Sequence, residues 1–262
     1  MNYTEYFIKC RQSSNIKDTS LDEFYLDPVT RIPTENFGDN YTDAVSSISA
    51  QVKIDLDNEP QEGIMINHND PWKFKEQMTT ICNHIVPFLE QNKFGCHLYV
   101  DKVYIYRTCK CDRSSSYLWH YDNNPKEVVK NIIYLTDVDE NNSPFEYLTT
   151  PDGNGVIEQP TRFGPGPGEW TPAPNNSRID EATMRELQSK GFSSKRVIGS
   201  TGTAYAFSND AIHRANPVVS GYRDVINIRV KPTMKKVENY MSKKHTTSFE
   251  TSGAANPNPE VM

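Results

Sequence analysis

From residue 96 onward the chain consists of short aromatic and β-branched segments separated by turn residues. In order they are "CHLYVDKVYIYRT", "SYLWHYD", "NIIYLTDV", "PFEYLTT", "KRVIG", "TAYAFSND" and "RDVINIRVKP". Such residues fit a pleated, half-buried surface, and several short strands at this spacing are typical of a sandwich or barrel. The 262 residues include 14 Tyr and are 11% aromatic, which agrees with a β-rich core. We therefore expect a mainly β protein.

The clearest helix signal precedes these strands, over residues 70–95. Asp70 can cap the helix, Pro71 fits its first turn, and Gly95 is a plausible terminator. Apolar residues recur at three- and four-residue steps and form one stripe, namely Phe74, Met78, Ile81, Ile85 and Phe88. Upstream, "QVKIDLD" (51–57) alternates apolar and polar residues, which predicts a half-buried strand.

Residues 151–177 are rich in Gly, Pro and Asn, which predicts a long irregular loop. Loops of this length are uncommon unless they are functional or disordered. We interpret this one as a water-excluding flap, with an unstructured insertion as the alternative. A short helix is expected to follow, with Ser177 as its cap and Gly191 at its end. The polar tail at 243–262 is predicted to be disordered.

Charge and cysteine content exclude some classes of partner. The formal net charge of −6 argues against a nucleic-acid backbone, which needs a concentrated basic face. The chain contains no run of 18 apolar residues, and its first residues lack a signal-peptide pattern, so we expect no membrane partner. Five cysteines, an odd number without a framework spacing, favour a reducing, cytoplasmic setting.

Three residues have the composition of a metal site. His120 and Asp122 are two positions apart in a strand-like run, so both can face one metal while Tyr121 points away. His213 follows a Gly-rich turn and a strand, and Arg223 comes ten residues later. Two imidazoles and a carboxylate on one face leave three positions open on a six-coordinate metal, as in non-haem Fe(II) oxygenases. The pair alone is a common pattern, but this order of elements favours a metal site over an ordinary surface pair.

Two segments carry a resemblance to a known family. They are "YLTDVDENNSPFEYL" (134–148) and "AIHRANPVVSGYRDVINI" (211–228). Through them the chain resembles the Fe(II)- and 2-oxoglutarate-dependent dioxygenases over about residues 97–232, and it is most similar to the phytanoyl-CoA dioxygenase-like branch. The resemblance implies a double-stranded β-helix, which is a jelly-roll, cupin-like barrel, with flanking helices.

The same resemblance implies roles for five residues. His120, Asp122 and His213 would bind Fe(II). Arg223 would pair with the far carboxylate of the cosubstrate 2-oxoglutarate, helped by the hydroxyl of Ser220. Arg214 and Arg229 are expected to be surface or structural charges, whereas Tyr104, Tyr106 and Asn131 lie on strands that border the site in such folds.

We expect three parts in one chain. Residues 1–95 would be an N-terminal decoration, with strands and a helix that pack on the barrel. Residues 96–232 would form the catalytic double-stranded β-helix, with the long loop and a short helix at 151–190. Residues 233–262 would be a C-terminal extension whose end is disordered.

The function implied is a dioxygenase that uses dioxygen and 2-oxoglutarate to hydroxylate an unactivated carbon of a small-molecule or lipid-like substrate, with release of succinate and CO2. One alternative is a prolyl-hydroxylase-like enzyme that acts on a protein side chain. Another is a non-catalytic cupin-like metal-binding barrel. Arg223 argues against the inert barrel, because such a barrel has no need of a buried carboxylate anchor.

Overall fold

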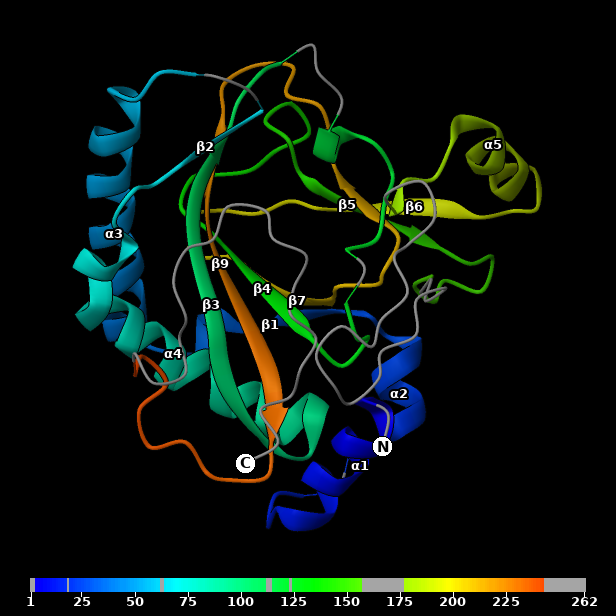
Figure 1. Ribbon diagram of the computed structural model, residues 1–262. Coiled ribbons are helices and arrows are strands. Elements are labelled where there is room, and N and C mark those ends of the chain that lie inside the picture. The colour runs from blue at the N-terminus through cyan, green and yellow to red at the C-terminus, as the bar shows by residue number, and fades with distance from the viewer. Residues whose placement is uncertain are drawn as a thin grey trace.

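The computed structural model describes residues 3–17, 19–61, 64–111, 115–122, 124–156 and 177–242. A six-stranded antiparallel sheet, in the order β1-β7-β4-β9-β3-β2, faces a three-stranded sheet in the order β6-β5-β8 (Figure 1). The strands are β1 (Val29–Ile32), β2 (Met65–Asn67), β3 (His97–Thr108), β4 (Val129–Tyr134), β5 (Phe145–Thr149), β6 (Ser193–Val197), β7 (Ala204–Ser208), β8 (His213–Ala215) and β9 (Arg223–Thr233). The expectation of a mainly β protein is confirmed.

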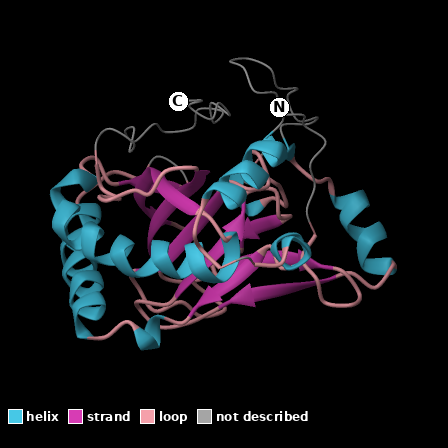
Figure 2. Ribbon diagram, turned by 90° about the horizontal axis from the view of Figure 1, so that it is seen from below, coloured by secondary structure: helices cyan, strands magenta, loops and turns pink. Residues whose placement is uncertain are grey.

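The helices of the described segments are α1 (Tyr3–Ser13), α2 (Leu21–Leu26), α3 (Asp39–Asp57), α4 (Lys75–Leu89) and α5 (Glu181–Ser189). Four of these helices, α1 to α4, lie on the side of the large sheet, whereas α5 lies beside the small sheet (Figure 1). Short 3-10 turns occupy Thr34–Asn36, Pro71–Phe74 and Ser115–Tyr117, and a π turn spans Glu90–Phe94. Figure 2 shows helices to the left of the strands and across them, with one helix apart at the right. None of the helices in the described ranges is both long and apolar enough to cross a bilayer.

The two faces of the large sheet differ because successive strand residues point to opposite sides. On β9, Ile226, Ile228 and Val230 belong to the main apolar core, which also holds the buried residues of α3 and α4. Their neighbours Asn227 and Arg229 line a cavity on the opposite face. The outer face thus packs on helices, and the inner face turns toward the small sheet.

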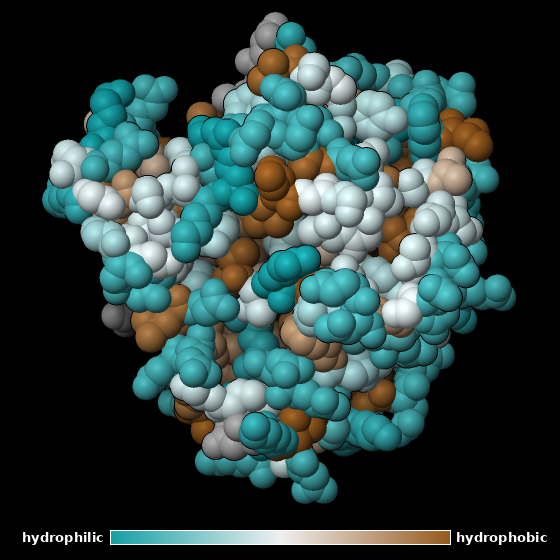
Figure 3. Space-filling model, turned by 180° about the vertical axis from the view of Figure 1, so that it is seen from behind, coloured by the Kyte–Doolittle hydropathy of each residue, from teal (hydrophilic) through white to brown (hydrophobic). Residues whose placement is uncertain are grey.

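A second apolar cluster lies between the two sheets. Phe145 of β5 is 4.6 Å from Phe207 and 5.0 Å from Tyr205, both of β7, between ring centroids. These rings fill part of the space between the sheets and leave the rest to the cavity. The outer surface, seen from behind in Figure 3, is mostly hydrophilic, with hydrophobic residues in separate small groups.

The helix predicted at 70–95 is confirmed in three successive pieces: the Pro71–Phe74 turn, α4 and the Glu90–Phe94 turn. Gly95 ends it with a left-handed φ of +63°. The predicted cap at Ser177 is wrong, because α5 begins later and its cap is Asp180, whose side chain accepts a hydrogen bond from the Thr183 backbone.

The strand predicted at 51–57 is also wrong, because these residues are the end of α3. The alternation of apolar and polar residues within 51–57 suggested a strand, but it is too short to distinguish a strand from a helix. Over the whole helix the buried positions recur at three- and four-residue steps: Tyr41, Ala44, Val45, Ile48, Val52 and Leu56. Most of the predicted flap (157–176) and the predicted disordered tail (243–262) lie outside the described residues.

Candidate metal centre and cavity

The backbone brings the two histidines together. The N–H of His120 donates to the carbonyl of His213 at 2.9 Å, and the N–H of His213 donates back at 2.8 Å. This closed pair joins the start of β8 to the segment that follows the Ser115–Tyr117 turn. The N–H of Asp122 donates to the carbonyl of Asn209 at 2.7 Å, which fixes the third residue. Residues some 90 positions apart therefore meet at one place, as the sequence predicted.

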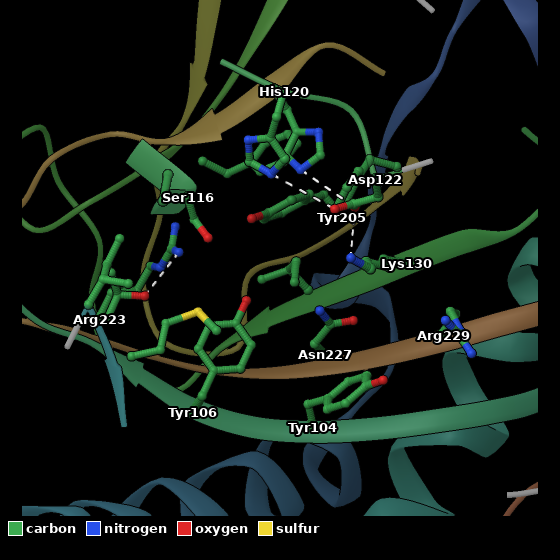
Figure 4. Close-up of a pocket in the computed structure, with 18 of the residues that line it drawn as sticks. Tyr104, Tyr106, Ser116, His120, Asp122, Lys130, Tyr205, Arg223, Asn227 and Arg229 are labelled. Atoms are coloured by element: carbon green, nitrogen blue, oxygen red, sulfur yellow. Dashed lines mark hydrogen bonds and ion pairs between the residues drawn. The ribbon is translucent and has the colours of Figure 1, made fainter. Parts of the chain in front are cut away.

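The three side chains form a compact set of candidate ligand atoms, and Figure 4 labels two of them, His120 and Asp122. One donor atom from each of His120, Asp122 and His213 lies within 4.8 Å of the others. The Nε2 atom of His120 is 3.8 Å from Asp122 Oδ1, and that of His213 is 3.6 Å from Asp122 Oδ2. Distances of this size leave space for an ion between the donors.

Second hydrogen bonds orient both rings. The Nδ1 atom of His120 is 2.7 Å from the Leu118 carbonyl, and that of His213 is 2.8 Å from the Ala211 carbonyl. A carbonyl can only accept, so Nδ1 carries the proton in each ring. Nε2 is then the unprotonated atom of a neutral imidazole, and it faces the carboxylate, which is the arrangement of metal-ligating histidines.

Burial also fixes the charge states. It lowers the pKa of His120 to about 3, with the neighbouring His213 adding to the effect. Burial likewise lowers the pKa of His213. It would raise the pKa of Asp122, but Lys130, whose Nζ is 2.7 Å from Oδ2, and the two imidazoles hold that pKa below its usual range. Neutral imidazoles and an ionised carboxylate are the states in which these groups bind metals.

The triad opens into a cavity of about 450 Å³ between the two sheets. This volume falls within the range of small-molecule sites. Among the described residues, four of the polar atoms in its walls are buried without a hydrogen-bond partner: Asn124 Oδ1, Tyr205 OH, Asn227 Oδ1 and Arg223 Nε. Buried polar groups are normally satisfied, so these atoms indicate a wall made for a polar ligand.

Arg223 lines this cavity from the start of β9, where it is buried. Its guanidinium donates from Nη1 to the Ser143 carbonyl at 2.5 Å and from Nη2 to the Thr108 hydroxyl at 3.3 Å. Ser220, in contrast, is exposed and is not among the cavity-lining residues. The structure therefore brings Arg223 to the cavity together with the triad and leaves Ser220 outside.

Of the other residues singled out in the sequence, some line the cavity and others lie outside it. Tyr104 and Tyr106 line the cavity. Asn131 faces the outer side, where its amide donates to the Ile228 carbonyl at 2.9 Å. Arg214 lies outside the cavity, donates to Glu146 at 2.7 Å and sits over the Trp119 ring at 4.6 Å.

Sequence reasoning did not single out several cavity residues, among them Lys130, Tyr205 and Asn227. Arg229 was expected to be a surface or structural charge. It does pair with Asp101, but it is buried and lines the cavity as well. The signal was available, because counting by two along the strand from Arg223 reaches Asn227 and Arg229 on the same face.

No family model matches the chain, and no curated protein matches it in sequence. Solved structures do match in fold. The epimerase SnoN, in complex with Fe3+, alpha ketoglutarate and nogalamycin RO, is 13% identical with a TM-score of 0.52, over 87% of this chain and 84% of that one. HygX from Streptomyces hygroscopicus, with nickel and 2-oxoglutarate bound, is 14% identical with a TM-score of 0.48, over 84% of this chain and 89% of that one. EctD from S. alaskensis, with bound Fe, is 12% identical with a TM-score of 0.47, over 85% and 81%.

At these identities the likeness concerns the fold alone. The similarity to SnoN confirms the double-stranded β-helix, a jelly-roll, cupin-like barrel with flanking helices, that was expected from the sequence.

Proposed function

We propose that the protein is an Fe(II)- and 2-oxoglutarate-dependent dioxygenase. The observation that carries this proposal is the triad: two neutral imidazoles and an ionised carboxylate, within 4.8 Å of one another, at the wall of a cavity. This composition is typical of non-haem Fe(II) oxygenases. The epimerase SnoN, which has a similar fold, binds Fe3+ and alpha ketoglutarate, and this supports the same cofactors for the present chain.

Bound Fe(II) would supply the chemistry with dioxygen, in which 2-oxoglutarate becomes succinate and CO2 and a substrate carbon is hydroxylated. The residues around it provide geometry. The backbone bonds between His120 and His213 hold the two ligands in place before a metal arrives. The carbonyls of Leu118 and Ala211 fix the orientation of the rings. The surrounding sheets keep water away from the reacting groups.

Arg223 is the proposed anchor for the far carboxylate of 2-oxoglutarate. A buried carboxylate must be paired, because an unpaired buried charge is very costly. Guanidinium offers a charge-assisted fork, and the Nε–H of Arg223 has no partner among the described residues. The hydroxyl that assists it is Thr108 rather than Ser220, because Thr108 already bonds the guanidinium and lines the same cavity.

The substrate is proposed to be a small molecule, as in the phytanoyl-CoA dioxygenase-like branch that the sequence resembles. A 450 Å³ cavity that also holds 2-oxoglutarate has room for a metabolite. A protein side chain as substrate remains the alternative for the same chemistry. We place the activity in the cytoplasm, because all five cysteines are free thiols, as expected in a reducing compartment.

The test is a titration of 2-oxoglutarate into anaerobic Fe(II) protein, followed by the absorption of the chelate. Arg223→Ala should weaken 2-oxoglutarate binding about ten- to a hundredfold, since a charge-assisted hydrogen bond contributes roughly 1.5–3 kcal/mol. Fe(II) affinity should change little. The matched control is Arg214→Ala. Arg214 also pairs with a buried carboxylate, that of Glu146, but it lies outside the cavity, so this variant should bind 2-oxoglutarate as wild type does.

A wild-type protein that forms no chelate would contradict the dioxygenase proposal altogether. A chelate that forms but never yields succinate, with any substrate in a metabolite screen or with peptides, would favour the inert metal-binding barrel.

A further inference from the structure

The inner face of the large sheet carries cations at a second place, far from Arg223. Arg223 and Arg229 point to the same side of β9, six residues apart, and both line the cavity. At roughly 3.3 Å per residue their backbones are about 20 Å apart. A five-carbon diacid is much shorter than this. If 2-oxoglutarate is anchored by Arg223, as proposed above, Arg229 is too far away to bind the same carboxylate.

Strand register places like charges beside Arg229. In the strand register, Arg229 lies opposite Lys130 of β4 and opposite Lys102 of β3. Paired residues on one face have Cβ atoms about 4.5–5.5 Å apart, and like charges there are destabilising. A row of three cations thus crosses β3, β9 and β4 on the inner face, and Lys130 and Arg229 of this row line the cavity.

The anions beside Lys130 and Arg229 each have a second partner. Asp101 forms ion pairs with two cations: it accepts a hydrogen bond from Arg229 Nε at 2.6 Å, and it lies 3.2 Å from Lys231 Nζ. Lys130 is paired with Asp122, at 2.7 Å. Asp122 is the proposed metal ligand, so its charge would be shared with the ion. With a metal bound to Asp122, neither Lys130 nor Arg229 would have a counter-ion to itself.

Neutral polar groups complete this end of the cavity. Asn227 has a buried Oδ1 atom without a partner among the described residues, and its cross-strand neighbour is Tyr104. Figure 4 shows Asn227, Tyr104, Lys130 and Arg229 on the side of the pocket away from Arg223. An amide can turn its N–H2 group toward an anion, and a phenol can donate its O–H.

We propose that the oxidised substrate carries an oxyanion, a carboxylate or a phosphate, which is bound by Lys130 and Arg229 beside Asn227 and Tyr104. This inference rests on the proposed function. It also restricts the reaction site. Because Lys130 Nζ is 2.7 Å from Asp122 Oδ2, a group bound to Lys130 lies next to the metal ligands. The carbon that is oxidised is therefore only a few bonds from the anionic group.

The experiment compares anions with their neutral isosteres. Acetate, butyrate and hexanoate, each with its primary amide, and inorganic phosphate are titrated calorimetrically into anaerobic protein loaded with Fe(II) and saturating 2-oxoglutarate. Wild type should bind at least one carboxylate, or phosphate, at least about tenfold more tightly than any amide, as one charge-assisted bond provides. Lys130→Gln should remove this preference. The exposed Lys75→Gln on α4 should keep it.

Arg229 needs a gentler variant, because its loss leaves Asp101 buried without its closest cation. Arg229→Lys keeps the charge and should retain a reduced preference for anions, while Lys130→Gln carries the main test. Absence of any anion preference in wild type overturns the inference.

Failure of the inference and failure of the proposed function give different results. If Lys130→Gln abolishes 2-oxoglutarate binding and Arg223→Ala does not, Lys130 is the cosubstrate anchor: the inference is overturned and the dioxygenase stands. If wild type binds no 2-oxoglutarate, the dioxygenase proposal fails, and the anion titration repeated with metal alone still decides whether this cluster is an oxyanion site.

Discussion

The two faces of the six-stranded sheet are made from the same strands and have opposite chemistry. Along β9, Ile226, Ile228 and Val230 are fully buried against the helices, whereas Arg223, Asn227 and Arg229 are nearly as buried on the inner face. These side chains are thus buried to nearly the same extent on the two faces, and the faces differ in whether the buried side chains are apolar or polar. The outer face lowers the free energy of the fold by burying apolar area, whereas the inner face holds polar groups, of which Asn227 Oδ1 and Arg223 Nε have no partner among the described residues.

Removal of a proposed metal ligand should have the largest effect on the function of the inner face. His213→Ala should reduce Fe(II) affinity by more than about a hundredfold, since loss of even a group that orients a ligand costs 10–100-fold. The fold should survive, because the backbone bonds of His213 remain. Metal titration under anaerobic conditions and succinate formation are the measurements, and Arg214→Ala is the adjacent control. His120→Ala and Asp122→Ala should behave as His213→Ala does; near-wild-type succinate from any of the three would show that its residue is not a ligand.

A pair of adjacent substitutions on β9 compares the faces directly. Ile228→Ala should destabilise the protein by about 2–5 kcal/mol, because it leaves a cavity in a fully packed core. Asn227→Ala should cost much less, since its Oδ1 has no partner among the described residues. Denaturant unfolding measures both. Equal losses of stability would mean that the inner face is packed as tightly as the outer one.

The smallest effect concerns a carboxyl on the apolar side. Glu90 accepts a hydrogen bond from the Leu98 N–H at 2.8 Å, and burial raises its pKa to about 7. Between the ordinary value of about 4.3 and this one, the folded protein holds a proton that the unfolded chain has lost. Stability should therefore fall as pH rises through this window.

In Glu90→Gln this fall should be absent. His97, whose Nδ1 is 3.8 Å from the carboxylate and whose own pKa is lowered by burial, contributes a slope of the opposite sign. The difference in unfolding free energy between wild type and variant, measured from pH 5 to 8, removes that common contribution. A difference that does not change with pH would refute the shifted pKa of Glu90.

The sequence was sufficient where local pattern and tertiary environment agree. The strands at β3, β4, β5, β6, β7 and β9 and the helix at 70–95 were predicted, because turn residues and apolar periodicity mark them. The strand expected at "SYLWHYD" (116–122) is wrong, because this segment starts in a 3-10 turn and, among the described residues, pairs only through isolated bridges at His120. The segment at 51–57 failed, since five or six alternating residues fit either a strand or a half-buried helix, and the longer period of α3 decides.

The triad was predictable from the sequence, but the walls of the cavity were not. His120, Asp122 and His213 stand out by type and order, and the structure brings them together. Lys130 carries no such signal, because its position depends on strand register: only the pairing of β4 with β9 shows that it lies beside Arg229. Ser220 was carried over by resemblance, and the actual path of the turn before β9 leaves it at the surface.

The closed pair of hydrogen bonds between His120 and His213 also bears on which ion the protein acquires. A site whose nitrogen and oxygen donors are set in advance accepts any first-row divalent cation of similar size. Affinity then follows the general order in which nickel, copper and zinc bind more tightly than iron. Occupancy by iron would depend on the supply of free ions rather than on the shape of the site. Protein purified in the presence of nickel or zinc should carry those ions and be inactive until they are exchanged.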